Sequence, residues 1–193
     1  VAYGSGRFVV SGFWGDDYTS TDGLVWAATE TPIGRQSGGG LSFGNGVFIC
    51  NDPSASATVW RSTDGWTWQS VQVPAGARTA GNPSFANGLH FVPLETGLYA
   101  TSPDGLNWTL RTLDSDEILQ DVVFADGHYV ASVGRTTKVT TDLVVWTESS
   151  QQSIWIYGLS HGHGLFVAVG GGIDGRILTS TDGINWTSRL IQA

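Results

Sequence analysis

Five aspartates recur along the chain at a nearly constant spacing, and carboxylates are the groups that a glycosidase or a calcium site would use. Each aspartate has a Ser or Thr two residues before it and a Trp four residues after it, and we call this segment an acidic turn. The aspartates are Asp22, Asp64, Asp104, Asp142 and Asp182, and the tryptophans are Trp26, Trp68, Trp108, Trp146 and Trp186. A catalytic site needs two carboxylates in one pocket, whereas five equivalent ones spaced 38 to 42 residues apart indicate a repeated structural unit.

A second turn motif runs in step with the acidic turn and has a glycine as its second residue. These glycines are Gly6, Gly46, Gly88, Gly127 and Gly164. The preceding Ser, Asn, Asp or His and the glycine can adopt the positive φ that tight hairpins need. Each repeat therefore predicts four short strands, A to D, with the glycine turn between A and B and the acidic turn between C and D.

About 40 residues and four antiparallel strands per repeat are typical of a β-propeller blade. The predicted fold is all-β, a single five-bladed β-propeller over residues 1–193. We place the blades at about 1–30, 41–72, 83–112, 122–149 and 159–193. The first repeat begins at strand A and the last ends at strand D, so we expect blade five to pack against blade one and close the ring.

The composition excludes several kinds of partner. Asp and Glu number 17 against 9 Lys and Arg, which gives a formal net charge of −8 that repels nucleic-acid phosphates. No apolar run approaches the ~18–20 residues of a membrane span, so no membrane insertion is expected. Cys50, the only cysteine, lies in the apolar run VFIC and is expected to be a small buried hydrophobe.

The acidic turn has a mechanical interpretation. The carboxylate of Asp182 can accept hydrogen bonds from backbone N–H groups one to three residues further on, and Gly183 permits a left-handed conformation. Trp186 offers an apolar face that we expect to pack against the next blade, while its indole N–H can reach a carbonyl.

The segment STDGINW and its copies resemble the Asp-box (BNR) repeats of sialidases and of many other propellers. The resemblance covers all five repeats, and it implies that the acidic turns are architectural and lie away from any catalytic centre. The fourth repeat departs from the pattern at Thr140 and Leu143, and the third departs at Pro103. We expect these two turns to be looser or differently bonded.

A sialidase would have three clustered arginines, a tyrosine nucleophile with a glutamate partner, six blades and a Phe/Tyr-Arg-Ile-Pro motif. This chain has five repeats, no such motif and arginines at inequivalent repeat positions. Five-bladed glycosidases carry carboxylates on their inner strands. The predicted A strands contain none, and the nearest is Asp121. The sequence therefore predicts no enzyme, no catalytic residue and no cofactor.

Two features could bind metal ions. His161 and His163 are two residues apart, as in a strand-borne zinc pair, but they align with an aromatic core position and a turn position of the other repeats. The segment LDSDE at 113–117 could bind calcium through oxygen atoms, although a solvated acidic loop is the preferred interpretation. No metal site is predicted.

The B–C and D–A loops share one side of the propeller and vary between repeats, so recognition is expected there. Candidate binding residues in these loops are Trp14, Asp16, Asp17, Tyr18, Trp155 and Tyr157. A closed ring would bring them together at one edge. Such an aromatic and acidic platform could bind a glycan, bind another protein, or seal the junction between blades five and one.

The predicted function is a non-catalytic binding or structural module. Its repeats also resemble those of phage tail, fibre and virion-surface proteins and of bacterial surface proteins, so the expected location is extracellular or on a virion surface. The expected partner is another protein, either a neighbouring subunit or a host-surface component, or a glycan. The alternatives are a carbohydrate-binding lectin, as in tachylectin-like five-bladed propellers, and a glycoside hydrolase.

Overall fold

The computed structural model of the chain describes residues 1–12, 17–29, 40–52, 57–74, 77–150, 152, 154–171 and 176–189. These residues form five antiparallel four-stranded sheets in which consecutive strands are neighbours. The predicted all-β propeller fold, with five blades of about 40 residues, is confirmed. Among the described residues there is no helix long and apolar enough to cross a membrane.

The strands follow the A–B–C–D order of each repeat. The first sheet contains β1 (Ala2–Gly4), β2 (Arg7–Val10), β3 (Tyr18–Ser20) and β4 (Ala27–Ala28). The second contains β5 (Leu41–Gly44), β6 (Val47–Asn51), β7 (Thr58–Ser62) and β8 (Gln69–Gln72). The third contains β9 (Ser84–Ala86), β10 (Leu89–Pro93), β11 (Leu98–Ser102) and β12 (Thr109–Thr112). The fourth contains β13 (Leu119–Ala125), β14 (His128–Val133), β15 (Thr136–Thr140) and β16 (Thr147–Glu148). The fifth contains β17 (Trp155–Gly162), β18 (Leu165–Gly171), β19 (Arg176–Ser180) and β20 (Thr187–Arg189).

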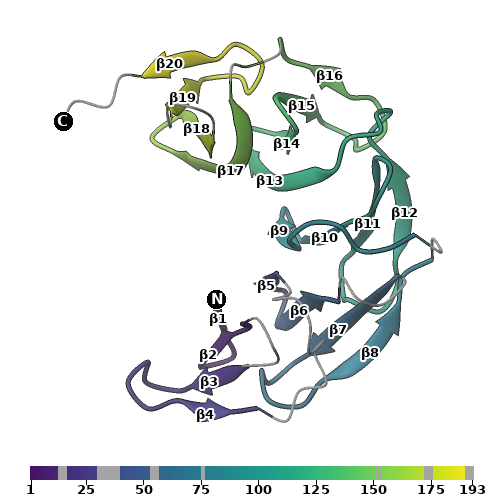
Figure 1. Cartoon of the computed structure of the whole chain (residues 1–193), viewed down its shortest axis with the longest axis vertical. Coiled ribbons are helices and arrows are strands. Elements are labelled where there is room, and N and C mark those ends of the chain that lie inside the picture. The colour runs from purple at the N-terminus through teal and green to yellow at the C-terminus, as the bar shows by residue number, and fades with distance from the viewer. Residues whose placement is uncertain are drawn as a thin grey trace.

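The five sheets are arranged as an open arc. The innermost strands β1, β5, β9, β13 and β17 lie beside one another in chain order. Figure 1 shows the first sheet at one end of the arc and the fifth sheet at the other, with the intervening sheets between them. The expectation that blade five packs against blade one is therefore wrong.

Both predicted turns form as their residues require. In the glycine turn of the second sheet, Asn45 and Gly46 have φ values of 47° and 74°. Two consecutive positive φ values fit the right-handed twist of a hairpin, and the other four glycine turns share them.

Each acidic turn is held by the same local hydrogen bonds. In the last, the Ser180 hydroxyl accepts the Gly183 N–H at 2.8 Å, while Asp182 Oδ1 accepts the N–H groups of Ile184 and Asn185 at 2.9 and 2.8 Å. In the equivalent third turn, the backbone N–H groups of Asn107 and then Leu106 lower the pKa of Asp104. These carboxylates are occupied by their own backbone.

The fourth acidic turn keeps this pattern although Leu143 replaces the glycine. Its N–H donates to Thr140 Oγ1 at 3.1 Å, against 2.8 Å for the glycine N–H in the other four turns. Leu143 adopts a φ of 61° and its side chain is buried. The third turn, with Pro103, has the same bonds as the others. The expectation that these two turns are looser or differently bonded is therefore wrong for the third turn, while the fourth turn keeps the bonding pattern with one longer hydrogen bond.

The apolar core lies between the sheets. We call the side of a sheet that meets the preceding sheet its leading face, and the opposite side its trailing face. Val47, Ile49 and Val59 on the trailing face of the second sheet pack with Val92, Ala100 and Trp108 of the third. Trp186 likewise packs with Val130 and Val139 of the fourth sheet. The tryptophan of an acidic turn therefore contacts the preceding blade, and the prediction that it contacts the next blade is wrong.

Each leading face also carries one aromatic pair that links strands A and B. The five pairs have ring centroids 4.5 to 4.9 Å apart, and they are Tyr3–Phe8, Phe43–Phe48, Phe85–His90, Phe124–Tyr129 and His161–Phe166. His161 thus occupies the aromatic position that the repeat predicts. Cys50 is fully buried, and burial raises the pKa of its thiol to about 12.

Candidate functional site

Loops of three successive sheets meet beside the first residue of β17. Glu117 lies in the connection between β12 and β13, Arg135 lies between β14 and β15, and Trp155 begins β17. The Arg135 guanidinium carbon is 5.6 Å from the centroid of the Trp155 ring, which is within range of a cation–π interaction. Trp155 is nevertheless 40% exposed.

Gly134 explains why these side chains come so close. A Cβ placed on Gly134 would lie 3.1 Å from Glu117 Oε2 and 3.4 Å from a ring carbon of Trp155. Its φ of 59° also favours glycine. The missing side chain leaves the space in which the acid and the indole face each other.

Backbone hydrogen bonds hold the connections in place. The Gln152 N–H donates to the Arg135 carbonyl at 2.7 Å, and the Ile156 N–H donates to the Gly134 carbonyl at 2.9 Å. Tyr157 is 60% exposed, and its ring lies against Gly171, the strand partner of Trp155. Glu117, Arg135, Trp155 and Tyr157 form what we call the loop-face patch.

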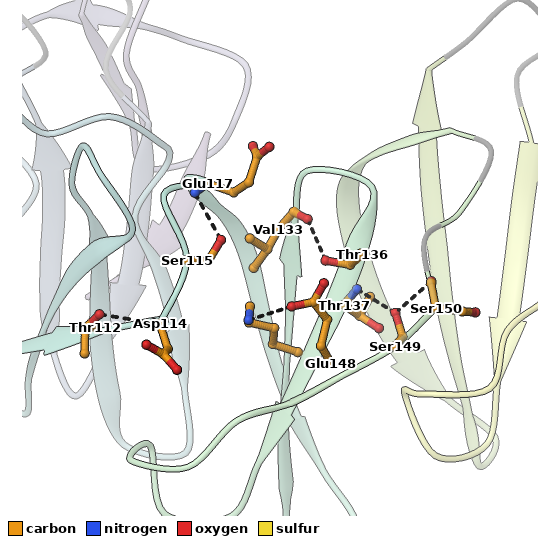
Figure 2. A network of polar contacts seen from close by, with 11 residues as sticks. Thr112, Asp114, Ser115, Glu117, Val133, Thr136, Thr137, Glu148, Ser149 and Ser150 are labelled. Atoms are coloured by element: carbon orange, nitrogen blue, oxygen red, sulfur yellow. Dashed lines mark hydrogen bonds and ion pairs between the residues drawn. The ribbon is translucent and has the colours of Figure 1, made fainter.

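Short polar contacts order the loops around this patch (Figure 2). The Glu117 N–H donates to Ser115 Oγ at 3.2 Å, and the Thr137 N–H donates to Ser149 Oγ at 2.9 Å. The carboxylates of Asp114 and Glu117 point in opposite directions. In the part of the chain that the structure describes, no three His, Cys, Asp or Glu side chains lie close enough to hold a metal ion.

Lys138, the only lysine of the chain, is almost fully buried on β15. Its Nζ lies 2.8 Å from Glu148 Oε2 on the neighbouring strand β16. This ion pair neutralises a charge inside the blade, so its role is structural.

Of the six residues predicted to bind, the four that the structure describes do not gather. Trp14 and Asp16 lie outside the described residues. Asp17 is buried, and Tyr18 on β3 belongs to the first sheet, whereas Trp155 and Tyr157 belong to the fifth. Figure 1 places these sheets at opposite ends of the arc, so only Trp155 and Tyr157 remain together.

Tyr18 instead lines an end of the arc. With Val10 and Trp26 it surrounds a hollow of about 290 Å³ on the leading face of the first sheet. Tyr18 and Trp26 are each 40% exposed there.

Asp121 carries a carboxylate within the inner strand β13. The sequence alone placed this residue just before the strand. Because β13 begins at Leu119, the prediction that no A strand carries a carboxylate is wrong. Asp121 Oδ2 accepts the Leu159 N–H of the fifth sheet at 2.9 Å, and Oδ1 accepts the Val122 N–H at 2.8 Å. Burial raises the pKa of Asp121 despite these bonds. The side chain joins two blades.

From the sequence alone, Glu117 was considered only as part of a possible calcium loop, and Arg135 was missed as a binding residue. The available signal was the connection between β14 and β15, where only Gly134 and Arg135 separate the two strands. An arginine in so short a loop projects its side chain from the surface. The first residue of the following blade, Trp155, lies beside it.

Comparison with solved structures gives propellers at low sequence identity. YCF48 bound to a D1 peptide is 16% identical, with a TM-score of 0.66 over 96% of this chain and 64% of that one. Virginiamycin B lyase from Staphylococcus aureus with quinupristin is 14% identical, with a TM-score of 0.73 over 93% of this chain and 64% of that one. A streptogramin B lyase is 12% identical, with a TM-score of 0.73 over 96% and 68%. The chain therefore spans about two thirds of the length of these proteins.

At these identities the likeness shows the β-propeller fold alone. No protein-family model and no curated protein matches the sequence.

Proposed function

We propose that this chain is a non-catalytic binding and structural propeller module that recognises a protein partner through the loop-face patch. The observation that carries the proposal is the exposed Trp155 with Arg135 stacked on it and Tyr157 beside it. Trp, Tyr and Arg are the residues that dominate protein–protein hot spots. Their rigid placement lowers the entropy that binding would cost.

The same geometry favours a protein over a glycan. Arg135 lies over the Trp155 ring, so one face of the indole is unavailable for stacking on a sugar. Glu117 and Arg135 place opposite charges beside the aromatic surface, as in the polar rim of a protein interface.

The acidic turns support the non-catalytic part of the proposal. Their resemblance to Asp-box repeats implies architecture, and their carboxylates are bonded to their own backbone N–H groups. Both oxygens of Asp121 also bind backbone. The resemblance to repeats of surface proteins supports an extracellular or virion-surface location, and YCF48, to which this chain is similar in fold, was solved bound to a D1 peptide.

The test uses a random peptide library displayed on phage and selected on the purified chain. Enriched peptides are made synthetically and their affinity is measured for Trp155→Ala and Arg135→Ala. Each substitution should weaken binding by about tenfold or more, as expected for a hot spot.

Trp66→Ala is the matched control. Trp66 is 44% exposed and lies 5.7 Å from the Arg7 guanidinium carbon, but it sits in an acidic turn on the opposite side of the propeller. Peptides that lose affinity equally for Trp66→Ala would contradict the proposal. Binding to a glycan array that Trp155→Ala abolishes would replace it with the lectin alternative.

A further inference from the structure

The two ends of the arc expose repeat positions that a neighbouring sheet covers wholly or in part at the internal junctions. At three of the four internal junctions, the glycine of the acidic turn lies against a β-branched side chain of the preceding sheet. A Cβ on Gly65 would meet Val9, one on Gly105 would meet Ile49, and one on Gly183 would meet Val130. For a Cβ on Gly23 in the first sheet, the three nearest atoms among the described residues all belong to Phe8 of its own sheet.

The leading face of the first sheet is aromatic and open. Tyr3 is 57% exposed, while its counterparts Phe43 and Phe85 are half-buried. Tyr18 is 40% exposed, while Ala100 and Leu178 at the same repeat position are buried. The hollow of about 290 Å³ beside Tyr18 is the space that a preceding sheet fills at the other junctions.

The trailing face of the fifth sheet is aliphatic and open. Val169 and Ile177 are 48% and 36% exposed, whereas Val59, at the repeat position of Ile177, is fully buried. A Cβ on Gly44 would collide with the Phe85 ring, but one on Gly162, at the same position, would have no neighbour within 4 Å among the described residues.

We infer that both end faces are docking surfaces and that their occupant is a further blade of the same repeat. Such a blade has an aromatic residue at the position of Phe85 and an acidic turn with its Trp, and both would cover Gly162, Val169 and Ile177. Continuity with the four internal junctions carries this inference, because the end faces use the same repeat positions.

A second copy of this chain is the wrong size for that place. Its five blades already take up 64 to 68% of the length of the matched lyases. The remaining third corresponds to two or three blades, whereas a second copy would bring five.

The test adds one blade to the full chain. Residues 80–113, which include the third sheet, are appended after Ala193. Eight residues then separate β20 from the appended first strand, within the 6 to 12 that separate the natural blades. We expect thermolysin to cleave a docked repeat at least about tenfold more slowly than an undocked one, because docked segments open rarely.

Ile177→Glu in the extended chain should remove this protection. Val144→Glu is the matched control, since Val144 is 70% exposed in an acidic turn away from both end faces. In the unextended chain, where Ile177 is 36% exposed, Ile177→Glu should lower the unfolding midpoint only modestly and leave one cooperative transition, which separates lost docking from lost folding.

Two results would overturn the inference. One is an appended repeat that is cleaved equally fast with and without Ile177→Glu. The other is a dimer of the unextended chain, detected by light scattering, that Ile177→Glu dissociates, because the occupant would then be a second copy.

Discussion

The junction between the second and third sheets and the outer face of the first sheet are built from the same repeat positions. At the junction, Trp108 packs against Val47, Ile49 and Val59, and His90 is fully buried. On the outer face, Trp26 is 40% exposed and lies beside a hollow. The repeat therefore specifies a blade, while a neighbouring blade determines how much each of its residues stabilises the fold.

The largest difference between the two regions is expected when the tryptophan of the acidic turn is replaced in each. Trp108→Ala should lower the free energy of unfolding by about 4 kcal/mol, since it leaves a cavity between two sheets. Trp26→Ala should lower it by about 1 kcal/mol, because much of this side chain is already in water. Urea unfolding at pH 7 measures both. Equal losses would mean that the outer face is covered in solution.

Acid should also destabilise the junction between the second and third sheets, because His90 is buried there, whereas Phe8 stands at the same repeat position in the first sheet. Burial lowers the pKa of His90 to about 4, although the nearby Gly44 backbone partly opposes this. The unfolded chain binds this proton near pH 6.5, so stability should be full above that pH and fall as the pH drops toward 4. The loss attributable to His90 is about 3 kcal/mol.

His90→Phe should remove that part of the acid sensitivity. Phe8, Phe48 and Phe166 stand at the same repeat position, so the ring fits. His128→Gln, at an exposed histidine, is the control for the loss of one histidine from the chain. If His90→Phe unfolds at the same pH as the unsubstituted chain, His90 is not the group that titrates.

The smallest expected effect comes from one methyl group on two equivalent glycines. Gly44→Ala should cost about 2 kcal/mol, since the new Cβ would collide with the Phe85 ring of the next sheet. Gly162→Ala should change stability by less than about 0.5 kcal/mol, since no atom of the residues that the structure describes lies within 4 Å of its Cβ. Thermal unfolding of the two variants tests this, and a destabilised Gly162→Ala would show that a neighbour covers the fifth sheet.

Several parts of the fold could be predicted because their causes are local. The bonds of the acidic turn join residues two or three apart, such as Asp182 and Asn185, and the hairpins depend on two adjacent residues such as Asn45 and Gly46. The predictions were wrong where a residue's position depends on a contact with another blade. The sequence could not show that Trp186 faces the fourth sheet, since that depends on which side of a sheet meets its neighbour.

The candidate site was predicted in part, and for the same reason. Trp155 and Tyr157 stood out because they break the repeat at the start of a strand, and they remain together. Arg135 and Glu117 join them through Gly134, which is a contact between connections of different blades. Tyr18 leaves the group because the arc does not close.

By itself the sequence determined the number of blades, their four strands and their two kinds of turn, because hydrogen bonding and φ preferences act within a few residues. Only the tertiary structure decided the curvature of the arc, the exposure of its two end faces and the meeting of three loops at Trp155. Those features follow from how side chains of one sheet fill the spaces of the next, and packing between residues about 40 positions apart cannot be read from either segment alone.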